Sequence, residues 1–149
     1  MQIKNSVEQK IKSVADKMPS FTYVYEDWTR ADVRLERLSL PAIINLLPVS
    51  GSLSLKKDQF RDAPNCMLVF VDKVQRDANG SDNEEVFERM KFAAMEFVTR
   101  LNQSGLFDPI EGDIPYSVIL ERLSPVLTGI SVSFKLKEVT GVCTSKVLR

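Results

Sequence analysis

The sequence feature that most constrains the fold is the alternating segment at residues 130–137, Ile-Ser-Val-Ser-Phe-Lys-Leu-Lys. Successive side chains of a β-strand point to opposite faces of a sheet, so this pattern predicts one apolar and one polar face. Such strands are typical of antiparallel sheets that cover a core on one side and contact water on the other. The residues expected to face water are Ser131, Ser133, Lys135 and Lys137.

Length and charge restrict the class of protein. The chain has 149 residues, a common size for one domain, with 20 basic and 20 acidic side chains and a formal net charge of zero. A neutral chain without a basic cluster is a poor candidate for binding nucleic acid, so we expect no nucleic-acid partner. No apolar run approaches the roughly 18 residues of a membrane span, and the first five residues do not resemble a secretory signal. We therefore expect a cytoplasmic protein without a membrane partner.

Two segments have the apolar periodicity of amphipathic helices. Residues 2–18 carry apolar side chains at steps of three and four, and Pro19 ends the pattern. A second helix is predicted over residues 82–102, capped by Ser81 or Asp82 and ended by Gly105. We expect it to bury an apolar stripe of Phe87, Met90, Ala94, Phe97 and Leu101 against a sheet.

The strands are predicted between and after these helices. Residues 21–28 and 40–47 are rich in β-formers, and the continuous apolar run at 66–71 is typical of a central strand covered on both faces. Residues 116–120 lead through a Ser124-Pro125 turn into the alternating strand. The expected fold is α+β, a two-layer sandwich in which a four- to five-stranded, mostly antiparallel sheet carries two helices on one face. Residues 1–149 are expected to form a single domain.

The long connection at residues 50–65 is the main candidate for an interaction site. It contains Ser-Gly-Ser, then Leu53-Ser-Leu55, then charged and turn residues, which together predict a short projecting hairpin. Connections of this length are usually functional or disordered, so the segment is either an arm that holds a partner or a surface loop without a role. The expected interaction residues are Leu53, Leu55, Lys56, Phe60, Arg61, Lys135 and Lys137.

Catalytic chemistry is not evident. The chain has no histidine, and its six glycines are scattered singly, which excludes the common triads, imidazole metal sites and phosphate loops. The carboxylates at 82–85 are better explained by helix capping than by a cation, and Asp108, Glu111 and Asp113 do not have the spacing of a calcium loop. Cys66 and Cys143 are expected to be free thiols. We therefore expect no enzyme activity, no metal and no cofactor.

The layout of the whole chain resembles small phage and prophage tail proteins of the tail-terminator or tail-completion kind. The resemblance lies in an N-terminal amphipathic helix, three strands with a long loop, a long helix beginning near residues 83–85, and a terminal hairpin. The segment that carries most of it is residues 127–137, a glycine-containing turn followed by the alternating strand. The resemblance implies a virion-assembly protein that forms homo-oligomers, often rings, through sheet edges and a projecting loop, and that also contacts other virion proteins.

Two other functions remain open at this stage. A cytosolic adaptor or regulatory domain could bind a protein or peptide by strand addition at a sheet edge. An enzyme could use a metal bound by Asp108, Glu111 and Asp113. The three hypotheses differ in what they require of the structure, namely an assembly surface, a free sheet edge or a cluster of metal ligands.

Overall fold

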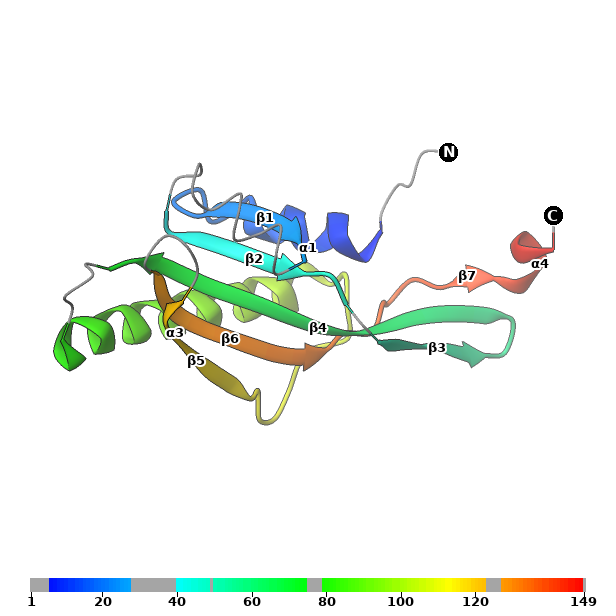
Figure 1. The fold of residues 1–149 in the computed structure, drawn as a ribbon. Helices are drawn as coiled ribbons and strands as arrows, with labels where there is room; N and C mark the ends of the chain where they lie inside the picture. The colour runs from blue at the N-terminus through cyan, green and yellow to red at the C-terminus, as the bar shows by residue number, and fades with distance from the viewer. Residues whose placement is uncertain (1–5, 28–39, 49, 75–78, 123–126, 149) are drawn as a thin grey trace.

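The computed structural model describes residues 6–27, 40–48, 50–74, 79–122 and 127–148 (Figure 1). Within these ranges the chain is an α+β protein with a seven-stranded mixed sheet and three helices. The helices are α1 (Val7–Ala15), α3 (Gly80–Ser104) and α4 (Thr144–Val147). The strands are β1 (Thr22–Glu26), β2 (Ala42–Leu46), β3 (Gly51–Lys56), β4 (Gln59–Lys73), β5 (Tyr116–Arg122), β6 (Leu127–Lys135) and β7 (Val142–Cys143).

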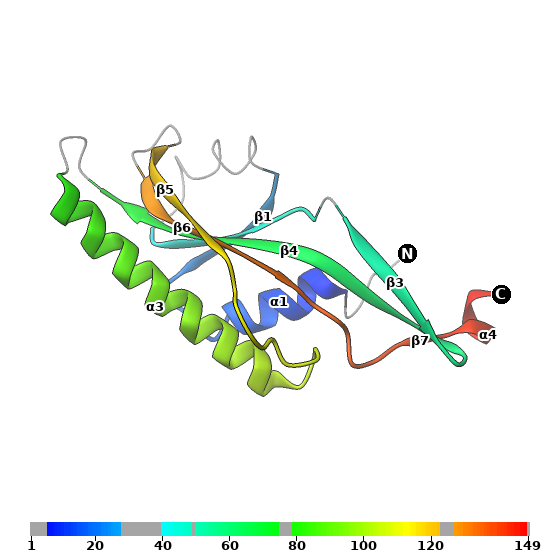
Figure 2. The same ribbon diagram turned by 90° about the horizontal axis from the view of Figure 1, so that it is seen from below.

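Strand β4 is the longest strand and belongs to two parts of the molecule. Its second half lies in the centre of the main sheet, whose order is β1-β2-β4-β6-β5. Its first half leaves this sheet and pairs with β3 on one side and β7 on the other. Figures 1 and 2 show these outer strands as an arm that extends beyond one end of the main sheet.

The segment at residues 50–65 contains the predicted hairpin, formed by β3 and β4, but it is not a separate connection, because β4 begins at Gln59 and continues into the central strand. Pro64 lies inside this strand, where β4 exchanges one set of partners for the other. Its carbonyl oxygen accepts a hydrogen bond from the amide of Leu136, 3.1 Å away. Proline has no N–H to give to a ladder, and a junction between two ladders is one of the few strand positions that tolerate it.

Helices α1 and α3 cover one face of the sheet (Figure 2). Their apolar stripes meet the even-numbered side chains of β4 and β6 in the main core, which includes Phe70 and Phe97 in an edge-to-face contact at 6.0 Å. The predicted stripe of the long helix is confirmed except at Phe87, which is only half-buried. No helix among the described residues is both long enough and apolar enough to cross a lipid bilayer.

The helix ends differ in detail from the sequence-based expectation. Helix α3 begins at Gly80, and its cap is Asn79, whose side chain accepts a hydrogen bond from the amide of Asp82 while the Asp82 carboxylate accepts one from the amide of Asn79. This reciprocal pair satisfies two amides that lack helical partners. The predicted stop is confirmed, since Gly105 has φ 71°, in the left-handed region that favours glycine.

The prediction that the second face of the sheet contacts water is wrong over its central part. Val24, Ile44, Val69 and Val71 form a second buried apolar cluster there, and Ser131 is also buried. Of the four residues expected to face water, only Lys135, at the end of its strand, is exposed. Ser133 and Lys137 are partly buried. The continuous apolar run of the central strand indicated two covered faces, and that interpretation is confirmed for Leu68–Val71.

The sheet is mostly antiparallel, as expected, and among the described strands only β1 and β2 pair in parallel. Fifteen residues separate these strands, enough for the crossover that a parallel pair requires. Strand β7 and helix α4 were not predicted, because both are too short to leave a periodic pattern. The predicted Ser124-Pro125 turn lies outside the described residues.

We predict that Gly129→Ala destabilises the fold strongly. Gly129 lies opposite Val71 in the centre of the sheet, and a Cβ at this position would stand 1.9 Å from the carbonyl oxygen of Phe70. Because the obstacle is backbone in a central strand, we expect a loss of about 3 kcal/mol or more in the free energy of unfolding, at the upper end of overpacking effects. Urea unfolding measures it. Gly80→Ala is the matched control, since no atom lies within 4 Å of its added methyl, and a loss of similar size there contradicts the argument.

Candidate interaction surface

The arm presents one apolar face, which is built by the register of its three strands. Leu55 lies opposite Phe60 in the β3–β4 ladder, and Phe60 lies opposite Val142 in the β4–β7 ladder. Directly opposed residues of antiparallel strands share a face, so these three side chains form a row across the arm. Leu53, two positions before Leu55, lies on the same face. We call these four residues the arm face.

The arm face is exposed although it is apolar. Leu53 is 71% exposed, Leu55 57% and Val142 53%, while Phe60 is partly buried. The opposite side of β3 carries Ser52, Ser54 and Lys56, so the strand has an apolar and a polar side like a strand that covers a core. In the described structure, no core lies beneath it, because the arm extends away from α1, α3 and the main sheet (Figures 1 and 2). A contiguous exposed apolar surface of this kind is typical of an interaction site.

The tip of the arm is basic. Lys57 and Asp58 form the turn between β3 and β4, and Lys57 has φ 54°. Lys56 and Arg61 flank this turn, which leaves residues 56–61 with three basic side chains and one acidic side chain. Among the described residues, none of the three basic groups forms an ion pair. Their charges are therefore available to a partner.

The structure groups the seven expected interaction residues only in part. Leu53, Leu55 and Phe60 share the arm face, and Lys56 and Arg61 belong to the tip. Lys135 lies at the base of the arm, opposite Asn65, where it lines a separate hollow of about 1030 Å³ together with Glu111 and Asp113. Lys137 follows the end of β6. Val142 was missed, because the two-residue strand that positions it has no detectable sequence pattern.

A second apolar surface lies between α3 and the edge strand β5. A groove of about 360 Å³ is lined there by Met95 and Val98 of the helix, Tyr116 of the strand, and Ile130 and Val132 of β6. Val118, on the same side of β5 as Tyr116, is also exposed. Because α3 does not cover the last strand of the sheet, Tyr116 and Val118 lack the helical cover that the side chains of β4 and β6 have. We call this surface the α3–β5 groove.

One charged residue shapes the α3–β5 groove. The ammonium group of Lys91 lies 5.1 Å from the centre of the Tyr116 ring and 3.0 Å from the Glu88 carboxylate. The hydrogen bond to Glu88 raises the pKa of Lys91 above its ordinary value, which favours the charged form that lies over the ring. Tyr116 itself lines the groove.

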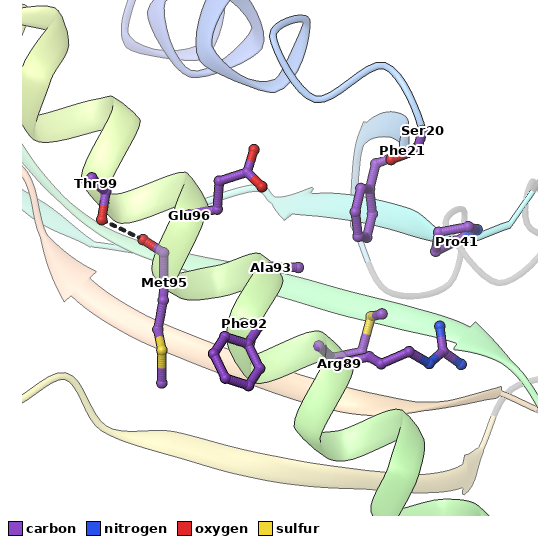
Figure 3. Close-up of a pocket in the computed structure, with 10 residues that line it drawn as sticks. Ser20, Phe21, Pro41, Arg89, Phe92, Ala93, Met95, Glu96 and Thr99 are labelled. Carbon is purple, nitrogen blue, oxygen red and sulfur yellow. Dashed lines mark hydrogen bonds between the residues drawn. The ribbon is translucent and has the colours of Figure 1, made fainter.

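A neighbouring hollow of about 640 Å³ lies on the side of α3 that faces Phe21 and Pro41, and it shares Met95 with the α3–β5 groove (Figure 3). It lies between Phe21 and Pro41 on one side and Ala93 and Glu96 on the other, and Figure 3 shows Phe92 and Met95 projecting from the helix beside it. Phe92 is exposed here. The charged side chains that line the hollow are Arg89 and Glu96.

The described residues contain no group of three or more cysteine, aspartate or glutamate side chains that could hold a metal ion. Asp108, Glu111 and Asp113 thus do not come together as the ligand set that the enzyme hypothesis requires. Both cysteines are free. Burial raises the pKa of the Cys66 thiol to about 12, whereas a hydrogen bond with Ser145 lowers the pKa of Cys143.

Comparison with known proteins does not assign this chain to a family. No protein-family model matches the chain, and no curated protein shows significant similarity to it.

We predict an alkaline loss of stability that depends on Cys66. Its thiol keeps its proton up to a pH of about 12 in the folded chain, while the unfolded chain releases it near the ordinary value of 9.0. Stability from this group is therefore complete below pH 9 and falls as the pH rises toward 12. Between pH 8 and pH 10 we expect the free energy of unfolding to fall by about 1 kcal/mol more in the wild type than in Cys66→Ala.

Urea unfolding at the two pH values measures this difference. The tyrosines and lysines titrate in both proteins, so their contributions cancel in the comparison. If the free energy of unfolding falls equally with pH in the wild type and in Cys66→Ala, the raised pKa of Cys66 is contradicted.

Proposed function

We propose that this chain is a non-enzymatic assembly protein of a phage or prophage tail, which associates with copies of itself and with other virion proteins through its arm and its sheet edges. The exposed arm face is the observation that carries the proposal. It has the alternation of a core-facing strand, yet it is presented to solvent at the end of the molecule. The free energy falls when a partner covers an exposed apolar surface and removes it from water.

The position of the arm supports self-association in particular. The arm extends from one end of the main sheet, while the α3–β5 groove lies on the body of the molecule (Figures 1 and 2). A contact between two different surfaces of identical chains is heterologous, and successive heterologous contacts produce a ring or a filament. Ring formation is what the resemblance to tail-terminator proteins implies. We place the assembled protein in the virion and its assembly in the cytoplasm.

A second function is favoured by the free edge of the main sheet. Among the described residues, β5 pairs only with β6, so its outer N–H and C=O groups have no ladder partner. A cytosolic adaptor or regulatory domain could bind a peptide there by strand addition. This alternative requires β5 but does not require the arm, and the two functions therefore separate experimentally.

We predict that Leu53→Asp/Leu55→Asp abolishes self-association without unfolding the chain. The two leucines are exposed, so we expect the free energy of unfolding to change by no more than about 0.5 kcal/mol. Charges on the arm face would remain buried without partners in an assembly, so the variant should be monomeric. Size-exclusion chromatography with light scattering measures the oligomeric state over a range of concentrations.

The matched control is Ser52→Asp/Ser54→Asp, which adds the same charges to the same strand on its opposite side. We expect this control to assemble like the wild type. A wild type that stays monomeric at high concentration contradicts the assembly function and favours the adaptor.

A further inference from the structure

We propose that the arm of one copy binds the α3–β5 groove of the next copy, with β3 running antiparallel to β5 and extending its sheet. This inference rests on the proposed self-assembly and names the acceptor for the arm. It follows from three independent matches between the surfaces, in their strand edges, their apolar side chains and their charges.

The first match is between two strand edges. Among the described residues, β3 pairs only with β4 and β5 pairs only with β6, so each strand has one edge without a ladder partner. The strands are six and seven residues long. Their similar length allows one ladder to satisfy most of the free backbone groups of both edges.

The second match is between apolar side chains. Leu53 and Leu55 stand two positions apart on the arm face, and Tyr116 and Val118 stand two positions apart on the helix side of β5. Pairing the two strands with these faces aligned places the leucines beside Tyr116 and Val118. They also lie next to Met95, whose side chain is 59% exposed on α3. This single contact therefore covers the groove and the four exposed strand residues Leu53, Leu55, Tyr116 and Val118.

The third match is between charges, and it selects the strand direction. Residues 108–113 contain Asp108, Glu111 and Asp113 and no basic residue, and they lead into Ile114 at one end of the groove. Among the described residues, these carboxylates form no ion pair with lysine or arginine. An antiparallel arm brings its basic tip to this acidic segment, whereas a parallel arm directs the tip toward the other end of β5.

The arm cannot reach the groove of its own chain. Strand β3 is held in its ladder to β4, and the arm extends away from the body at the end of the main sheet (Figures 1 and 2). The contact is therefore made between copies. Each copy has one arm and one groove, so the contact repeats from copy to copy.

The test uses two variants that each retain one half of the contact. The arm variant is Leu53→Asp/Leu55→Asp, and the groove variant is Met95→Lys/Val118→Lys, which alters side chains that are exposed in the single chain. We expect each variant alone to be monomeric and folded by circular dichroism. We expect a mixture of the two to form a one-to-one complex, because the intact arm of the groove variant binds the intact groove of the arm variant.

The outcomes distinguish failure of this inference from failure of the proposed function. A monomeric wild type overturns both. If the wild type and the groove variant both assemble, the α3–β5 groove is not the acceptor. That outcome leaves the proposed function intact and indicates contact between two arms. Phe92→Lys is the matched control, since Phe92 is exposed on α3 but does not line the α3–β5 groove, and loss of assembly in this control alone moves the acceptor to the hollow that Phe92 lines.

A charge exchange tests the antiparallel direction. In Lys56→Glu/Lys57→Glu the tip becomes acidic, and we expect the dissociation constant of the assembly to rise roughly tenfold. Adding Glu111→Lys/Asp113→Lys to the same chain should restore most of the affinity. If the chain with all four charge reversals binds no more tightly than Lys56→Glu/Lys57→Glu, the antiparallel direction of β3 and β5 is excluded.

Discussion

The backbone ladder of β4 is the interaction on which the rest of the structure depends. One half of this 15-residue strand is paired with β2 and β6 in the centre of the sheet, where Leu68, Val69, Phe70 and Val71 are fully buried. The other half is paired with β3 and β7 and has a buried side chain only near the junction, at Ala63 and Pro64. Because one continuous strand crosses both regions, the stability of the core is transmitted to the arm, which has little core of its own. The arm is therefore a rigid extension of the sheet rather than a loop.

This arrangement explains how an apolar face stays exposed in a folded chain. A three-stranded ribbon with apolar side chains on one side usually collapses onto a helix or another sheet, because burial of apolar surface is favourable. Here α1 and α3 are both committed to the main core, and the ion pair between Lys10 and Glu138 fastens the segment after β6 against α1. Of the described helices, only the four-residue α4 lies beside the arm (Figure 1). Within the described residues the apolar side of the arm stays exposed, and this observation motivates the proposed function.

The buried polar groups of the body show the opposite behaviour, since each described one is satisfied inside the chain. Thr128 donates a hydrogen bond to Asn83 at 2.8 Å, which ties β6 to the first turn of α3. Asn45 donates to the hydroxyl of Tyr23, which donates to Glu8, and burial raises the pKa of that tyrosine. The exposed apolar side chains of the described residues include those of the arm face and of β5, together with others such as Phe92 and Leu148. The two proposed contact surfaces, the arm face and the α3–β5 groove, belong to this set.

Local periodicity in the sequence determined the α+β class, the places of α1 and α3 in the chain and the central strand, because each depends on side chains a few residues apart. It also located the arm and the residues Leu53, Leu55 and Phe60. Tertiary structure alone decided that β1 and β2 run in parallel, that β4 continues through Pro64 into the arm, and that Ser131 lies in a buried face. It also brought Val142 beside Phe60, 82 positions away in the chain. These features depend on pairing between distant segments, which hydrogen bonds of the backbone make and which no local pattern of side chains encodes.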